Sequence, residues 1–170
     1  MLIDEIIEFC DKQYREHPCM DCKNESKCNH DCKICLDDLN YHRNELRLDY
    51  DCEHLLDYYV CRYSYKYCSE IMYALDKIDL SRYPCFNILS LGCGSAPDLM
   101  AFDCINCGKN ITYWGFDSCT SWEKVHNKII SNFNGSVQFF RGKDVRNYFE
   151  NCPYKNFNVI IIEYLISFFL

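Results

Sequence analysis

No apolar run in the 170-residue sequence reaches the roughly eighteen residues needed to cross a bilayer. The run that comes closest, over residues 157–170, is too short and contains Glu163. The N-terminus carries acidic residues where a secretory signal peptide carries basic ones, and no apolar segment of the right kind follows. We therefore expect a cytoplasmic protein, in a reducing compartment, with no membrane partner.

Basic residues are also scarce relative to acidic ones, with 18 Lys and Arg against 25 Asp and Glu and a formal charge of -7. Because phosphate binding relies on clustered Lys and Arg, this balance disfavours a broad nucleic-acid surface but not a local basic patch. The content of 49% hydrophobic and 16% aromatic residues excludes intrinsic disorder. The length fits one domain with a full core, or a small module beside a partial domain.

Cysteine, in contrast, is abundant, with 15 residues in the chain. In a reducing compartment, paired cysteines indicate metal ligands before they indicate disulfides. Residues 19–35 hold a C-x2-C-x5-C-x3-C-x2-C array in a segment that has almost no aliphatic side chains for a core. Metal binding supplies the folding free energy that such a segment lacks. The array consists of Cys19, Cys22, Cys28, Cys32 and Cys35.

This array predicts a zinc site, because two C-x2-C pairs complete a tetrahedral set of thiolates. The simplest set of ligands is the array without Cys28. An iron-sulfur cluster, which would use the same thiolates, is the alternative to zinc. Four further residues are near enough in sequence to substitute or to build a second centre: Cys28, His30, His42 and Cys52.

Helical periodicity appears in two places before residue 86. Residues 2–16 carry apolar side chains at helical spacing and predict a short amphipathic helix. From Asp51, apolar and tyrosine side chains recur every four residues as far as Leu75, which predicts a longer helix. We interpret its tyrosines, which include Tyr59, Tyr63 and Tyr67, as packing residues. Stacking on a substrate or cofactor ring is the alternative.

From residue 86 onward, strand patterns alternate with helix patterns. The predicted strands cover residues 87–91, 111–117, 136–142 and 157–165, and the predicted helices cover 96–105, 121–133 and 144–152. Because parallel neighbours need crossover connections, this alternation predicts an α/β fold with a mostly parallel sheet. The expected organisation is a helix and metal-binding module at 1–49, a helical segment at 50–83 and the α/β domain at 84–170.

A glycine-rich turn follows the first predicted strand, in the place where open parallel sheets bind ligands. Gly92 and Gly94 permit a tight turn and close approach of a ligand to the backbone. A dinucleotide fingerprint, G-x-G-x-x-G, would need a third glycine at position 97, where the sequence has Pro97. The smallest replacement for a third glycine, Ala96, instead stands one position earlier.

Residues 86–170 resemble the first half of a class I S-adenosylmethionine-dependent methyltransferase, which has a Rossmann-like fold. The resemblance lies in "ILSLGCGSAPDL" (88–99), "YWGFDS" (113–118), "FFRGKDV" (139–145) and "FNVIIIEYL" (157–165). It implies that Asp117 binds the ribose hydroxyls of S-adenosylmethionine and that Asp144 lies near the adenine amino group. The full cofactor set that it implies is Ser90, Gly92, Cys93, Gly94, Ala96, Asp117, Ser118 and Asp144.

The same resemblance places Glu163 and Tyr164 near the sulfonium and the substrate, as the candidates for catalysis. The sequence departs from the family pattern at Ser90, where an acid is common, and at Ala96, where the third glycine stands. It also supplies four strands where the family's sheet has seven. A fragment is one interpretation of this shortfall of strands, and an open sheet edge of this kind would seek a partner or a second copy.

Two functions fit this sequence. One is an S-adenosylmethionine-dependent methyltransferase with a zinc module, acting on RNA, protein or a small molecule. Such a module ahead of the domain is reminiscent of some RNA-modifying methyltransferases. The other is a non-enzymatic, zinc-binding interaction protein with a degenerate or truncated nucleotide-binding fold.

Overall fold

The structure, a computed structural model, describes residues 1–17, 19, 30–41, 52–105, 108–142 and 156–162. Its elements in chain order are α1 (Leu2–Glu16), α2 (Cys32–Tyr41), α3 (Glu53–Leu75), η3 (Leu80–Arg82), β1 (Cys85–Leu91), α4 (Pro97–Ile105), β2 (Asn110–Asp117), η4 (Thr120–Trp122), α5 (Glu123–Asn132), β3 (Ser136–Arg141) and β4 (Val159–Ile162).

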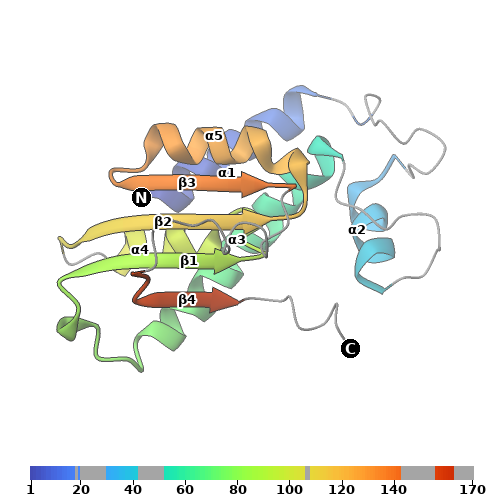
Figure 1. Cartoon of the computed structure of the whole chain (residues 1–170). Helices are drawn as coiled ribbons and strands as arrows, with labels where there is room; N and C mark the ends of the chain where they lie inside the picture. The colour runs from blue at the N-terminus through green and yellow to red at the C-terminus, as the bar shows by residue number, and fades with distance from the viewer. Residues whose placement is uncertain (18, 20–29, 42–51, 106–107, 143–155, 163–170) are drawn as a thin grey trace.

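The four strands form one sheet in the order β3-β2-β1-β4, and every neighbouring pair is parallel. The chain builds β1, β2 and β3 outward in one direction and then places β4 on the other side of β1 (Figure 1). Strand order therefore reverses at β1, which is where an open α/β sheet binds its ligand. The predicted α/β, Rossmann-like fold is confirmed.

One face of the sheet carries the main core. Phe86 and Ile88 of β1 and Ile111 and Tyr113 of β2 alternate with residues of the opposite face, as strand geometry requires. Buried residues of α1, α3, α4 and α5 pack against them in one continuous cluster. In Figure 1, α3 and α4 lie behind the strands, while α2 lies beyond the ends to which the strand arrows point.

The opposite face carries a smaller hydrophobic cluster of Leu89, Trp114 and Phe116, and Phe140 of β3 packs against it. The rings of Phe116 and Phe140 stack with centroids 4.6 Å apart. On the same face of β4, Ile160 and Ile162 are 61% and 54% exposed. Within the described part of the chain, β4 pairs only with β1, and the expected association through this edge stays a prediction.

Most of the predicted elements are present. The helix expected at 2–16 is α1, the long helix is α3, and the helices expected at 96–105 and 121–133 are α4 and η4 with α5. The strands expected at 87–91, 111–117 and 136–142 are β1 to β3. Residues 159–162 of the fourth expected strand form β4, whereas the helix expected at 144–152 lies outside the described residues.

Two details of the helices bear on these predictions. The helix α2 was not expected, because Cys32 and Cys35, which are buried with Leu36, were interpreted as metal ligands and not as the apolar positions of a helix. The packing interpretation of the tyrosine stripe holds at Tyr59, which packs against the main core with its ring 5.8 Å from that of Trp122.

None of the helices described is long and apolar enough to cross a membrane.

We predict that Gly115→Ala destabilises the fold. A Cβ at this position of β2 would lie 2.8 Å from the Tyr113 ring and 2.9 Å from both the Cys93 sulfur and the Phe139 ring. Crowding of this kind in a packed core costs about 1–3 kcal/mol of unfolding free energy, measurable by urea denaturation. The control Asn110→Ala changes an exposed residue of the same strand and should stay within about 0.5 kcal/mol of the wild type. Equal stability of the two variants would contradict the packing described.

Candidate cofactor and metal sites

The loop between β1 and α4 has an unusual backbone. Gly92, Gly94 and Ala96 have φ angles of 72°, 49° and 57°, all in the left-handed region. Glycine adopts this region freely, but the Cβ of Ala96 makes it cost roughly 1–2 kcal/mol. The structure buries Ala96 completely, so the third position of the loop is both strained and enclosed.

Hydrogen bonds fasten this loop to the end of β2. The N–H groups of Gly92 and Cys93 both donate to the Phe116 carbonyl, at 2.8 and 3.0 Å. The N–H of Ala96 closes a turn by donating to the Cys93 carbonyl. The backbone of the loop is therefore held at the carboxyl end of the strand next to β1.

Asp117, the last residue of β2, lies directly beside the loop. Its carboxylate accepts one hydrogen bond from the Gly94 N–H and one from the Cys119 N–H, each 2.8 Å long. Burial raises the pKa of Asp117, and these two N–H donors oppose that shift. A carboxylate offers about four acceptor positions, so about two remain for a ligand. The structure thus brings Asp117 and the glycine loop together, as a shared cofactor site would require.

A buried polar group lies below the loop. The Tyr113 hydroxyl donates to the Asp98 carboxylate at 2.9 Å, and the Leu99 N–H donates to the same oxygen at 2.9 Å. Burial raises the pKa of Asp98, while the hydroxyls of Ser90 and Tyr113 lower it. Ser90 itself is 2% exposed, so its side chain belongs to this internal group. Asp98 lies in the first turn of α4, and nothing in the local sequence signals its burial.

His126 of α5 holds the loop from the other side. Its Nε2–H donates to the Gly94 carbonyl at 2.7 Å, and its ring stacks on Phe139 with centroids 3.8 Å apart. Burial, the largest cause, lowers the pKa of His126 to about 4, so the ring is neutral at physiological pH. Gly94 is thus held by its N–H through Asp117 and by its carbonyl through His126. The sequence marks His126 as a residue of an amphipathic helix but gives no sign of this bond.

The remaining residues predicted for cofactor binding and catalysis are placed as follows. Cys93 is buried in the core beneath the loop, and burial raises the pKa of its thiol. Ser118 is exposed and follows Asp117 directly. Asp144, Glu163 and Tyr164 lie outside the described residues.

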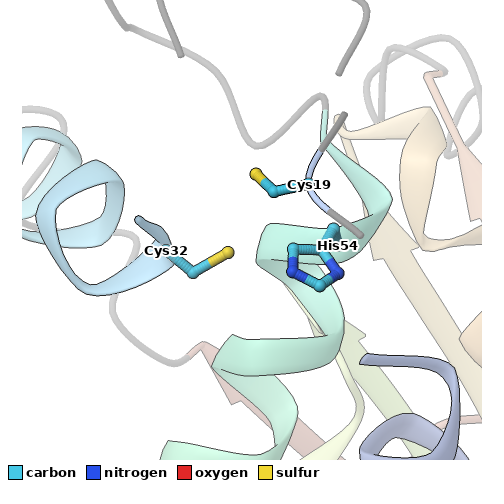
Figure 2. Close-up of side chains that lie close together, drawn as sticks. All are labelled: Cys19, Cys32 and His54. Carbon is cyan, nitrogen blue, oxygen red and sulfur yellow. The ribbon is translucent and has the colours of Figure 1, made fainter. Parts of the chain in front are cut away.

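Away from the sheet, three potential metal ligands converge. One ligand atom each from Cys19, Cys32 and His54 lie within 4.8 Å of one another. Figure 2 shows the three side chains pointing toward a common point from three different segments. Cys32 begins α2, and His54 lies in the first turn of α3. A set of two thiols and one imidazole is suited to zinc.

The His54 ring is held in place without using its Nδ1. It stacks on Tyr14 with ring centroids 4.3 Å apart, and within the described part of the chain the buried Nδ1 has no hydrogen-bond partner. Burial lowers the pKa of His54, which favours the neutral imidazole that binds metals. Sequence reasoning missed His54, although a histidine two residues after Cys52 was a signal for a further ligand.

The other predicted ligands divide into three groups. Cys35 and Cys52 are buried in the same small cluster as Cys32, together with Leu36 and Leu55. The alternative ligand His30 is exposed. Outside the described residues lie Cys22, Cys28 and His42.

Comparison with known proteins finds similarity among solved structures. No protein-family model matches the chain, and no curated protein matches it. The chain is similar to a solved structure of the plantazolicin methyltransferase BpumL in complex with SAH, with 18% sequence identity and a TM-score of 0.44. The match covers 91% of this chain and 50% of that chain, so this chain spans half the length of that protein.

We predict that His126 gives the protein an acid-sensitive stability. Its pKa is lowered from 6.5 to about 4 on folding, so between these values the unfolded chain binds a proton that the folded chain does not. Stability from this group is therefore complete above about pH 6.5 and is lost as the pH falls to about 4. Relative to His126→Gln, the wild type should lose up to about 3 kcal/mol over this range, measured by urea denaturation.

The matched control for this comparison is Asn127→Ala, an exposed substitution on the same helix. Its difference from the wild type should be independent of pH. A constant difference between the wild type and His126→Gln from pH 7 to pH 4 would contradict the buried, neutral state of His126.

Proposed function

We propose that the chain binds S-adenosylmethionine at residues 92–96 and Asp117, as part of an S-adenosylmethionine-dependent methyltransferase. The observation that carries this proposal is the left-handed loop after β1, held at the point where strand order reverses, with a carboxylate beside it. The half-buried Gly92 and Gly94 have no Cβ and let a ligand approach the backbone, and an adjacent carboxylate suits a ribose diol because both its oxygens accept hydrogen bonds.

The residues of the loop fit this ligand. A Cβ at Gly94 would lie 3.7 Å from the Trp122 ring, which is ordinary contact, so glycine is needed there for its φ of 49°. Asp117 uses one acceptor position on Gly94 and one on Cys119, and its further lone pairs can accept from the two ribose hydroxyls. His126 fixes the Gly94 carbonyl and so prevents the loop from turning away.

Bound S-adenosylmethionine supplies an activated methyl group on a positively charged sulfur. Because methyl transfer is an in-line displacement, this chain's part is mainly to position the cofactor and exclude water.

In the proposed arrangement Asp117 orients the ribose and Asp144 contacts the adenine. Glu163 and Tyr164, which follow β4, contact the methyl acceptor. A general base is needed only if the acceptor must lose a proton. The proposed acceptor is RNA, a protein or a small molecule.

Two observations favour a second function, a non-enzymatic binding protein. Ala96 occupies a left-handed position that favours glycine, and Ser90, which stands where the resembled family often has an acid, is enclosed in the core. Both features suit a nucleotide-binding fold that binds its ligand but no longer catalyses methyl transfer. Binding of S-adenosylmethionine without methyl transfer to any acceptor would support this function over the enzyme.

We predict that the purified chain binds S-adenosylhomocysteine, a cofactor product that cannot react, and that Asp117→Asn weakens this binding. Hydrogen bonds to a charged group contribute about 1.5–3 kcal/mol, so the affinity should fall by roughly 10- to 100-fold. Isothermal titration calorimetry measures both values.

The control is Asp76→Asn, which removes an exposed carboxylate at the end of α3 and should leave the affinity unchanged. Absence of binding by the folded wild type, or equal affinities for wild type and Asp117→Asn, would refute the proposed site.

A further inference from the structure

We propose that Cys19, Cys32 and His54 bind one zinc ion, which fastens the cysteine-rich segment to the first turn of α3. This site differs from the all-thiolate set expected from the sequence, because one ligand comes from the long helix that packs on the α/β core. It does not depend on the proposed cofactor site.

The spacing of the three ligand atoms is close to that of a bound site. With Zn–S and Zn–N bonds of about 2.3 and 2.0 Å, ligands at tetrahedral angles lie roughly 3.5–3.8 Å apart. The observed separations are within 4.8 Å, so small side-chain movements bring the ligands to bonding distance. The three side chains already point toward one another (Figure 2).

The condition of His54 provides an independent argument for a ligand. Its buried Nδ1 has no hydrogen-bond partner in the part of the chain that the structure describes, and buried nitrogens of this kind are rarely left unpaired. Stacking on Tyr14 fixes the plane of the ring. Either ring nitrogen of His54 can be the ligand beside the two thiols, and binding through Nδ1 would give that atom the partner that the described residues do not provide.

Zinc in structural sites takes four ligands, and a nearby cysteine completes the set. Cys35 lies one helical turn after Cys32 on α2, and Cys52 lies two residues before His54. Both are buried in the small cluster that contains Cys32. Each cysteine binds the ion as a thiolate and releases its proton to solvent, so binding weakens as the pH falls.

Zinc at this position would connect the cysteine-rich segment to the end of α3 that borders the cofactor loop. Leu55 belongs to the small cluster that contains Cys32, whereas Leu56 belongs to the main core. One turn further along α3, Tyr59 contacts Trp122, whose ring would touch a Cβ at Gly94. The ion thus holds α2 in place beyond the carboxyl ends of the strands, the side on which the loop lies (Figure 1).

The first test uses the wild-type chain as purified. Metal analysis should find one zinc ion per chain, and X-ray absorption at the zinc edge should show sulfur neighbours at about 2.3 Å together with a nitrogen neighbour at about 2.0 Å. A chain without stoichiometric zinc, an iron-sulfur absorption spectrum, or a zinc environment of four sulfurs would each overturn the proposal.

The second test replaces zinc by cobalt, whose visible absorption reports tetrahedral ligands and whose near-ultraviolet absorption reports thiolates. Cys19→Ser and Cys32→Ser should reduce the thiolate band. His54→Phe keeps a ring on Tyr14 but removes the ligand nitrogen, and should weaken cobalt binding at least tenfold or shift the visible bands. An unchanged spectrum and affinity in His54→Phe would overturn the role of His54.

Two variants serve as matched controls, and both should bind cobalt as the wild type does. His30→Asn removes an exposed histidine, and asparagine tolerates the φ of 54° at that position. Cys85→Ser changes a half-buried thiol at the start of β1, in a different part of the fold. If His54→Phe does not fold, the zinc-edge spectrum of the wild type still decides the proposal.

A third measurement tests the fastening of α2. Removal of zinc by a chelator should accelerate hydrogen exchange in residues 32–41 at least tenfold while leaving β1 and β2 unchanged. Equal exchange in α2 with and without the metal would show that the ion does not hold this helix. Binding of S-adenosylhomocysteine, measured on the same samples, separates failure of the metal site from failure of the cofactor site.

Discussion

The hydrogen bond from the Gly94 N–H to the Asp117 carboxylate joins the two halves of the proposed cofactor site. Three residues of the loop adopt left-handed backbone angles, and one of them, Ala96, is strained because it has a Cβ. The loop keeps this shape because the end of β2 accepts its N–H groups, while His126 donates to the Gly94 carbonyl. The parallel register of β1 and β2 makes these contacts geometrically available.

Much of the fold could be predicted from the sequence, because it depends on local periodicity. Alternating strand and helix patterns after residue 86 specify a parallel sheet, and the glycines mark the turn where a ligand approaches. The positions of Gly92, Gly94 and Asp117 were predictable for the same reason. Contacts between distant segments were not: neither the burial of Asp98 against Tyr113 nor the bond from His126 to the loop leaves a local signal.

The cysteine-rich segment shows a different limit of sequence reasoning. Its shortage of aliphatic residues suggested a module held together by metal alone, with ligands from the array and with His30, His42 or Cys52 as alternatives. In the structure, Cys32 and Cys35 are buried together with Leu36 of α2 and Leu55 of α3, and the third potential ligand at the metal site is His54. Cysteine spacing predicted that thiols of this segment lie together, as Cys19 and Cys32 do, but the position of His54 beside them depends on how α3 packs.

In the proposed function, the loop over residues 92–96 binds the cofactor. Hydrogen exchange of its backbone amides, followed with and without S-adenosylhomocysteine, tests this most directly because it reports on the loop itself. We expect slower exchange at residues 92–96 and at the end of β2 when the ligand is present, with α2 and β4 unaffected. Unchanged exchange in the loop at saturating ligand, or protection confined to another part of the chain, would contradict it.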